Sequence, residues 1–160
     1  MTPGANAPGS PAPVRWEYRV HEQILPSLRR AGHAICGTDI VIEHTGYQDP
    51  AAGPHKLQRN LRLLLLDQAE RPDDPFTLFN LGLAYSELGR AAESLPFLQR
   101  CLQQSHPADS ILPKLYAALV LAHERLGQAG QALAACRQGR VRCPDDPHLV
   151  LLEGQLCRAR

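Results

Sequence analysis

Side chains suited to acid–base, metal-binding or stacking chemistry gather near the beginning of the chain. Trp16, His21, Glu22, Asp39 and His44 all lie in one short segment. A carboxylate accepts protons well when burial raises its pKa, and a neutral imidazole nitrogen binds divalent metal ions. The rest of the chain has no comparable cluster, so any chemistry is expected here.

The elements that must position these side chains are predicted to be a strand, a helix and a second strand. Residues 16–20 alternate between apolar and polar, which is the period of a β-strand. Residues 22–30 have apolar side chains at helical spacing. Residues 38–44, TDIVIEH, are β-branched and apolar and predict a second strand. The resulting unit, residues 15–50, is too small to have a core of its own.

A different pattern organises the middle of the chain, from Asp74 to Leu102. Small and apolar residues recur at helical spacing at Leu78, Leu81, Gly82 and Tyr85. Gly89 then interrupts the pattern, because glycine readily adopts the left-handed conformation that ends helices. A second apolar stripe follows at Leu95, Leu98 and Leu102. Two helices are therefore predicted, with Gly82 and Ser94 where they approach closely.

This stretch resembles a tetratricopeptide repeat (TPR), a helix–turn–helix unit of about 34 residues. The signature positions are held by Leu78, Leu81, Gly82, Tyr85, Gly89 and Ser94. Leu78 stands where the repeat usually has Trp, and the closing Pro comes one position late, at Pro107. A pair of unrelated amphipathic helices is the alternative interpretation.

A second copy of this hairpin begins near Ser110. Its signature positions are held by Tyr116, Leu119, Gly127, Ala132 and Pro144. The two turn glycines lie further apart than one period by about one helical turn, and we place the insert in the connector 105–113. His123 occupies the Tyr position of this copy and is predicted to be a packed helix histidine.

The predicted fold class is mainly α, with TPR-like hairpins that form a short α-solenoid after the strand–helix–strand unit. Residues 55–71 form a leading helix, and the motif D-D-P at 73–75 recurs at 145–147 as a helix start. The repeat region is 55–160, with hairpins at about 76–104 and 110–142 and a partial unit at 147–160. Because terminal repeats need capping, residues 149–156 are expected to fray or to pack on another copy.

Two motifs upstream of the repeats widen the resemblance. R-V-H-E-Q-I at 19–24 and I-E-H-T-G-Y at 42–47 precede the helices in that order. Together they resemble the C-terminal part of certain bacterial family 2 glycosyltransferases of the GT-A type, which carry TPR repeats after the catalytic domain. The resemblance runs from about Arg15 to the end and implies sugar transfer from a nucleotide donor.

The resemblance also implies roles for individual residues. Glu22, beside His21, matches the place of the acidic base that takes a proton from the acceptor hydroxyl. Trp16 would stack on a sugar or acceptor ring. His21 or His44 would be a ligand of a divalent metal, Mn²⁺ or Mg²⁺, once a complete site is assembled. The alternative for Glu22 is structural, because an acidic residue at a helix start suits the helix dipole and capping.

The sequence also departs from that family. No Rossmann-like run precedes Arg15, and no D-x-D motif is present to hold metal and donor diphosphate. We therefore expect a fragment or truncated paralogue that does not transfer sugar alone. The predicted function is a TPR module whose groove binds a protein or peptide. The alternatives are a glycosyltransferase completed by a separate catalytic half, and a structural remnant without a partner.

Composition limits the remaining possibilities. The 160 residues carry a net charge of +1, which gives no reason to expect nucleic acid as a partner. No apolar run in the sequence is long enough to span a membrane, and no signal peptide is visible. Residues 1–14 are rich in Pro and Gly and predict a disordered leader. The five cysteines contain no C-x-x-C pair and are predicted to be reduced, core-filling thiols of a cytoplasmic protein.

Overall fold

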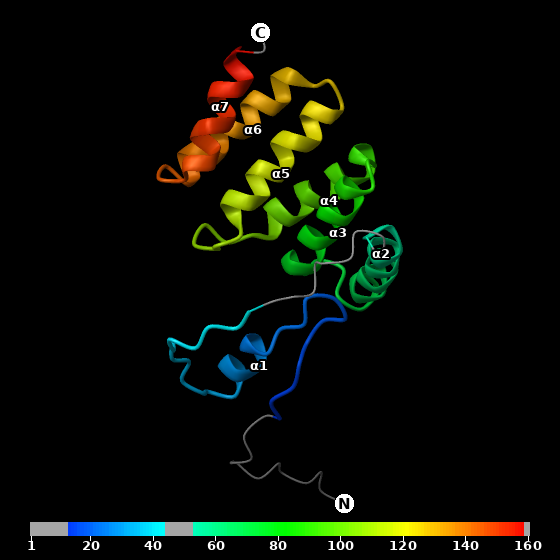
Figure 1. Ribbon diagram of the computed structural model, residues 1–160, viewed down its shortest axis with the longest axis vertical. Helices are drawn as coiled ribbons and strands as arrows, with labels where there is room; N and C mark the ends of the chain where they lie inside the picture. Colours follow the sequence, from blue (N-terminus) through cyan, green and yellow to red (C-terminus); the bar gives the residue numbers. More distant parts are fainter. Residues whose placement is uncertain (1–12, 44–52, 159–160) are drawn as a thin grey trace, which may run out of the picture. The chain divides into compact units, whose positions relative to one another are not determined.

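The computed structural model describes residues 13–43 and 53–158 of the chain (Figure 1). The chain divides into two units, residues 1–50 and 51–160. In the described residues the first unit contains α1 (Leu25–Arg30), and the second contains α2 (Gly53–Glu70), α3 (Pro75–Glu87), α4 (Ala91–Gln104), α5 (Leu112–Arg125), α6 (Ala129–Arg142) and α7 (Pro147–Arg158). None of these described helices combines the length and apolarity needed to cross a bilayer.

The strand predicted over residues 16–20 is not formed, and this segment makes a small closed loop instead. Glu17 and Gln23 exchange two backbone hydrogen bonds, of 2.8 and 2.9 Å, in an isolated antiparallel bridge. Between them, Tyr18 and His21 adopt left-handed conformations, with φ of 69° and 58°. An alternating segment is stable as a strand only beside further strands, and residues 13–43 supply none.

The second predicted strand, residues 38–44, is also not found where the structure describes it. Residues 38–43 have no regular secondary structure, and Ile40, Val41 and Ile42 are exposed. Their β-branched side chains favour a strand only through packing on a sheet face, which is missing here. His44 lies outside the described residues, as do residues 45–50 of the predicted unit and residues 1–12 of the predicted leader.

The helix predicted over residues 22–30 is shorter than expected. Helix α1 begins at Leu25, with Pro26 in its first turn, and Gly32 follows its end with φ of 77°. Its N-cap is Ile24, and no side chain caps it. The alternative interpretation of Glu22 as a capping residue is therefore wrong.

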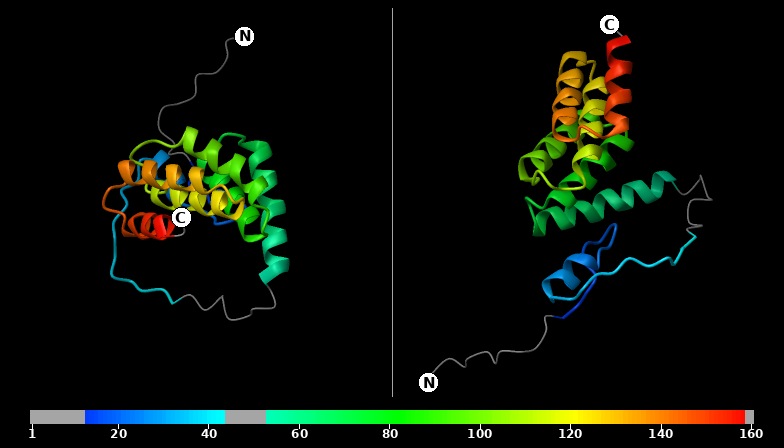
Figure 2. Two further views of the ribbon diagram at one scale, coloured as in Figure 1. Left: turned by 90° about the horizontal axis from the view of Figure 1, so that it is seen from above. Right: turned by 90° about the vertical axis from the view of Figure 1, so that its left-hand side faces the viewer.

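The helices of the second unit follow one another from α2 to α7, and each packs against the next (Figure 1, Figure 2). Helices α3 and α4 form one antiparallel hairpin, and α5 and α6 form the next, as the sequence predicts. Helix α5 also contacts both α3 and α7. The first helices of successive repeats therefore lie side by side in one layer.

The predicted helix starts and turns are confirmed. The Asp74 carboxylate caps α3 by accepting hydrogen bonds from the backbone N–H and the hydroxyl of Thr77, at 2.8 and 2.7 Å. Asp146 makes the equivalent bond to a backbone N–H at the beginning of α7, at 2.9 Å. Gly89 and Gly127, with φ of 74° and 70°, make the two hairpin turns.

A hydrophobic core runs continuously from α3 to α7. Its fully buried members include Leu78, Leu98, Leu115, Cys136 and Leu149. His123 is buried too, as predicted, and its Nδ1 lies 2.7 Å from Gln128 Oε1. Leu149 and Leu156 bury α7 in the core of its own chain, which argues against the expected fraying of residues 149–156.

The insert between the two hairpins lies where the sequence places it. Residues 105–111 link α4 to α5, whereas the shorter segments 71–74 and 143–146 make the other links between repeats. The Asp109 carboxylate closes the longer link by accepting a hydrogen bond from the backbone N–H of His106, at 2.7 Å.

The prediction that the cysteines fill the core holds fully for two of the five, and Cys143 is partly buried against the core. Cys101 and Cys136 are buried, and burial raises the pKa of the Cys101 thiol to about 11. This thiol therefore stays protonated and unreactive at neutral pH. Cys36 and Cys157 are exposed instead.

Candidate functional site

The residues predicted for sugar transfer do not share an enclosed site in the described part of the chain. The side chain of Trp16 is 66% exposed, and His21, Glu22 and Asp39 are exposed as well. The burial that would make Glu22 a good proton acceptor is therefore missing. His44, the remaining predicted residue, lies outside the described residues.

The described residues also do not fit the metal ion that the resemblance implies. Over 13–43 and 53–158, no three His, Cys, Asp or Glu side chains lie together as a metal centre needs. His21 accordingly belongs to no such group in this part of the chain.

The signature residues of the first hairpin build its helix–helix contact. Leu78, Leu81 and Tyr85 on α3 are buried. A Cβ atom added to Gly82 would lie only 2.4 Å from Leu98 Cδ2 on α4, so this contact requires glycine. The Ser94 hydroxyl crosses the same contact and donates a hydrogen bond to the Gly82 carbonyl oxygen, at 2.7 Å. The predicted close approach at Gly82 and Ser94 is therefore confirmed.

In the second hairpin the large and small side chains at the helix–helix contact are exchanged between the two helices. Tyr116, Leu119 and Ala132 are buried, and Pro144 lies in the link before α7. Where α3 has Gly82, α5 has Val120, and where α4 has Leu98, α6 has Cys136; both are fully buried. In the first hairpin a small residue on the first helix faces a large one on the second helix. In the second hairpin the first helix has the larger residue and the second helix has the smaller one.

Among solved structures, the chain is similar to a thermophilic TPR protein of Thermus thermophilus. The TM-score is 0.58 at 21% sequence identity, and the match covers 69% of this chain and 54% of that chain. The chain has the TPR fold. It spans about half the length of that protein, and at this identity the likeness shows the fold alone. No model of a protein family matches the sequence, and a search of curated proteins finds no match.

One side of the TPR array carries a stripe of exposed residues on helix α5. Lys114, Leu121, Glu124 and Arg125 are exposed, and Ala117 is half-buried among them. Their spacing places them on one side of α5, opposite the side on which Tyr116 meets Gly139 of α6. Leu121 is 43% exposed, so this stripe offers an apolar contact between charged groups.

The stripe continues at the same repeat positions on α7. His148, Leu151, Gln155 and Arg158 are exposed, and each lies one TPR period, about 34 residues, after a member of the α5 stripe. Leu151 is 56% exposed. Because α5 and α7 are in contact, the two stripes form one surface, which we call the first-helix surface.

The first-helix surface is held in place by a contact between α5 and α3. The Arg125 guanidinium donates hydrogen bonds to the Ser86 hydroxyl, at 2.7 Å, and to the Ser86 carbonyl oxygen. On α3, Leu83 is half-buried and packs on the core at the stripe position. Leu121 therefore lies on a helix that is hydrogen-bonded to its neighbour α3.

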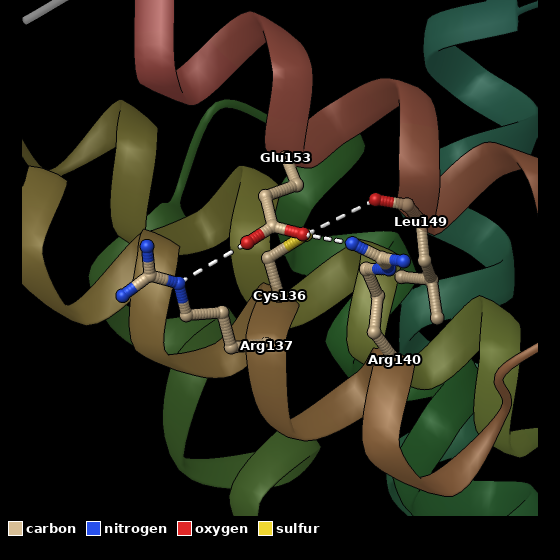
Figure 3. A network of polar contacts seen from close by, with 5 residues as sticks. All are labelled: Cys136, Arg137, Arg140, Leu149 and Glu153. Atoms are coloured by element: carbon tan, nitrogen blue, oxygen red, sulfur yellow. Dashed lines mark hydrogen bonds and ion pairs between the residues drawn. The ribbon is translucent and has the colours of Figure 1, made fainter.

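Helix α7 is fastened to α6 by a polar network around Glu153 (Figure 3). The Glu153 carboxylate accepts a hydrogen bond from Arg137 Nε, at 3.1 Å, and another from Arg140. Nearby, the Cys136 thiol donates to the Leu149 carbonyl oxygen, at 3.3 Å. Hydrogen bonds from Arg140 and Arg137 lower the pKa of Glu153 below its ordinary value.

We expect Glu153→Gln to lower the thermal midpoint of unfolding by a few degrees at neutral pH, because amide oxygen binds two arginines less strongly than carboxylate. A lowered folded-state pKa stabilises the fold above the ordinary glutamate pKa of about 4.3, and this stability is lost as pH falls through the lowered value. Melting curves of both proteins between pH 7 and pH 3 should therefore converge at acidic pH. A difference that stays constant over this range would contradict the role of the Glu153 charge.

Two side-chain interactions of the array were not predicted from the sequence. The Tyr85 ring stacks on Phe97, with ring centres 5.4 Å apart, and the Arg90 guanidinium lies over the same Tyr85 ring at 4.7 Å. Phe97 is next to Leu98 and not at helical spacing from it, so the apolar stripe of α4 does not indicate this residue. The role of Glu153 was missed as well, although Arg137 and Arg140 on one side of the preceding helix are a signal for an acidic partner.

Proposed function

We propose that this chain is a TPR-type binding module whose first-helix surface takes an extended segment of a partner protein. The observation that carries the proposal is the exposure of Leu121 and Leu151 on the matching stripes of two neighbouring first helices, α5 and α7. Leu121 and Leu151 are 43% and 56% exposed, so covering the exposed part of each contributes about half of the 1.5–3 kcal/mol that full burial of a leucine gives. Two such contacts along one segment add to the affinity for a partner.

The charges on the same surface indicate the composition of that segment. Lys114, Arg125 and Arg158 are exposed around the two leucines, and Glu124 is the acidic residue on the α5 stripe. The balance favours a partner segment in which apolar side chains alternate with acidic ones.

We expect short displayed peptides selected on the full chain to carry apolar and acidic residues together. Their affinity should fall by about tenfold or more with Leu121→Asp or Leu151→Asp, because each change removes an apolar contact and adds a repelling charge. Val141→Asp is the matched control, since Val141 is 82% exposed but lies on α6. Peptides that bind the two stripe variants as tightly as the parent chain would overturn the proposal.

Descent from a family 2 glycosyltransferase stays a prediction of the sequence resemblance. The same holds for a separate catalytic half as partner and for a cytoplasmic location. It also holds for the roles predicted for four residues, Trp16, His21, Glu22 and His44. On this prediction the chain alone does not bind sugar donors. Calorimetric titration with nucleotide sugars and Mn²⁺ tests it, and micromolar binding would show a donor site in this chain.

A further inference from the structure

Residues 38–43 form an apolar run that the described part of the chain does not cover. The side chains of Ile40, Val41 and Ile42 are 76%, 91% and 85% exposed. No hydrogen bond joins the backbone of this run to another described residue. Both its backbone N–H and C=O groups and its apolar side chains are therefore accessible to a partner.

The residue types of this run favour an extended conformation. Three consecutive β-branched side chains lose conformational freedom in a helix and suit a strand. Because successive side chains of a strand point to opposite faces, Ile40 and Ile42 would share one face. Asp39, Val41 and Glu43 would share the other face. Residues 13–43 and 53–158 form no sheet that could receive such a strand.

The two carboxylates of the run disfavour a second copy of this chain as the partner. If two copies paired antiparallel about Val41, Asp39 of one copy would lie directly opposite Glu43 of the other. If they paired parallel and in register, each carboxylate would lie beside its own counterpart. Like charges directly opposite each other destabilise a pair of strands, so both arrangements of self-pairing are disfavoured.

The same carboxylates match a basic edge strand. Exposed edge strands of natural sheets commonly carry lysine, which hinders pairing between two such edges. Lysines opposite Asp39 and Glu43 would form pairs of opposite charge at both ends of the run. Apolar residues between these lysines would pack on Ile40, Val41 and Ile42.

We propose that residues 38–43 bind as an added strand to the open, basic edge of a β-sheet in a partner protein. Main-chain hydrogen bonds supply affinity in this mode of binding, and the side chains on the two faces supply specificity. The sheet that the β-branched run needs is then provided by the partner. This contact does not depend on the first-helix surface.

A synthetic β-hairpin peptide with an Asn-Gly turn is the probe, and its outer strand reads Lys-Val-Val-Val-Lys. Residues 38–43 would complete a sheet of three strands, the number at which small sheets become stable. Amide hydrogen exchange of the full chain, followed by mass spectrometry, measures binding. We expect fast exchange of residues 38–43 in the chain alone and exchange slowed by about tenfold or more with millimolar hairpin. A hairpin with glutamate at both lysine positions should protect this run much less.

A reversal of charge tests the specificity. Asp39→Lys combined with Glu43→Lys should exchange the preference, so that the glutamate hairpin protects residues 38–43 better than the lysine hairpin does. Helical content in circular dichroism should stay unchanged, because this run has no regular secondary structure in the chain alone. Ile35→Asp is the matched control, since Ile35 is 46% exposed but lies outside the run, and it should bind like the parent chain.

Three results would overturn the proposal. The first is slow exchange of residues 38–43 already in the chain alone, which would show that they are covered without a partner. The second is an absence of protection by either hairpin. The third is equal protection by the lysine and glutamate hairpins, because the carboxylates would then not select the partner.

Discussion

Replacing Gly82 with valine is expected to lower the free energy of unfolding by about 2–3 kcal/mol, the upper part of the usual range for overpacking a core. A Cβ atom at this position would lie 2.4 and 2.6 Å from Leu98 Cδ2 and Cγ. Leu98 is fully buried and cannot move into solvent, so α3 and α4 must separate. Urea unfolding followed by circular dichroism measures the loss.

The second hairpin supplies the compensating change for Gly82→Val. The pair Gly82→Val with Leu98→Cys reproduces the residues that α5 and α6 carry as Val120 and Cys136. Leu98→Cys alone removes buried volume and should also destabilise, by about 2 kcal/mol. The double variant should be more stable than the sum of the two losses predicts, by at least about 1 kcal/mol. Strict additivity would show that Gly82 and Leu98 do not determine the spacing of these helices.

Gly139→Ala is expected to lower the free energy of unfolding as much as Gly82→Val, by about 2–3 kcal/mol, although it adds a single methyl group. The new Cβ atom would lie 2.8 Å from Tyr116 Cβ on α5 and 3.1 Å from Leu149 Cδ1 on α7. Tyr116 Cβ is bound directly to the backbone, so a side-chain rotation does not relieve the clash. The change therefore pushes α6 away from two helices at once.

Gly130→Ala is the matched control for this prediction, because Gly130 lies on the same helix and a Cβ atom there would meet nothing within 4 Å. It should stabilise the protein slightly, by up to about 1 kcal/mol, through the better helix propensity of alanine. Urea unfolding of both variants gives the comparison. Equal effects of Gly130→Ala and Gly139→Ala would contradict the steric account.

The repeat region could be predicted from the sequence because its determining interactions are local. Asp74 caps a helix that begins at the next residue, and Gly89 and Gly127 end helices by their own backbone conformation. The spacing of Leu78, Leu81 and Tyr85 follows from one helix alone. Each of these signals acts within a few residues, so the TPR pattern indicated the hairpins correctly.

The first unit could not be predicted in the same way. The alternation over 16–20 and the β-branched run 38–44 predict strands only if neighbouring strands exist, and the described residues supply none. The first-helix surface was missed for a related reason. Exposure of Leu121 and Leu151 depends on which helices lie beside α5 and α7, and an apolar residue in an amphipathic pattern is otherwise expected to be buried.

The opposite sizes at Gly82 and Val120 have a consequence for the choice of helix partners while the chain folds. If α3 met α6 instead of α4, Gly82 would face the small Cys136 and leave a cavity. If α5 met α4, Val120 would meet the large Leu98 and clash. Both mispaired hairpins are therefore less stable than the native ones. The size difference therefore favours pairing of each first helix with its own second helix, although the two repeats are otherwise similar.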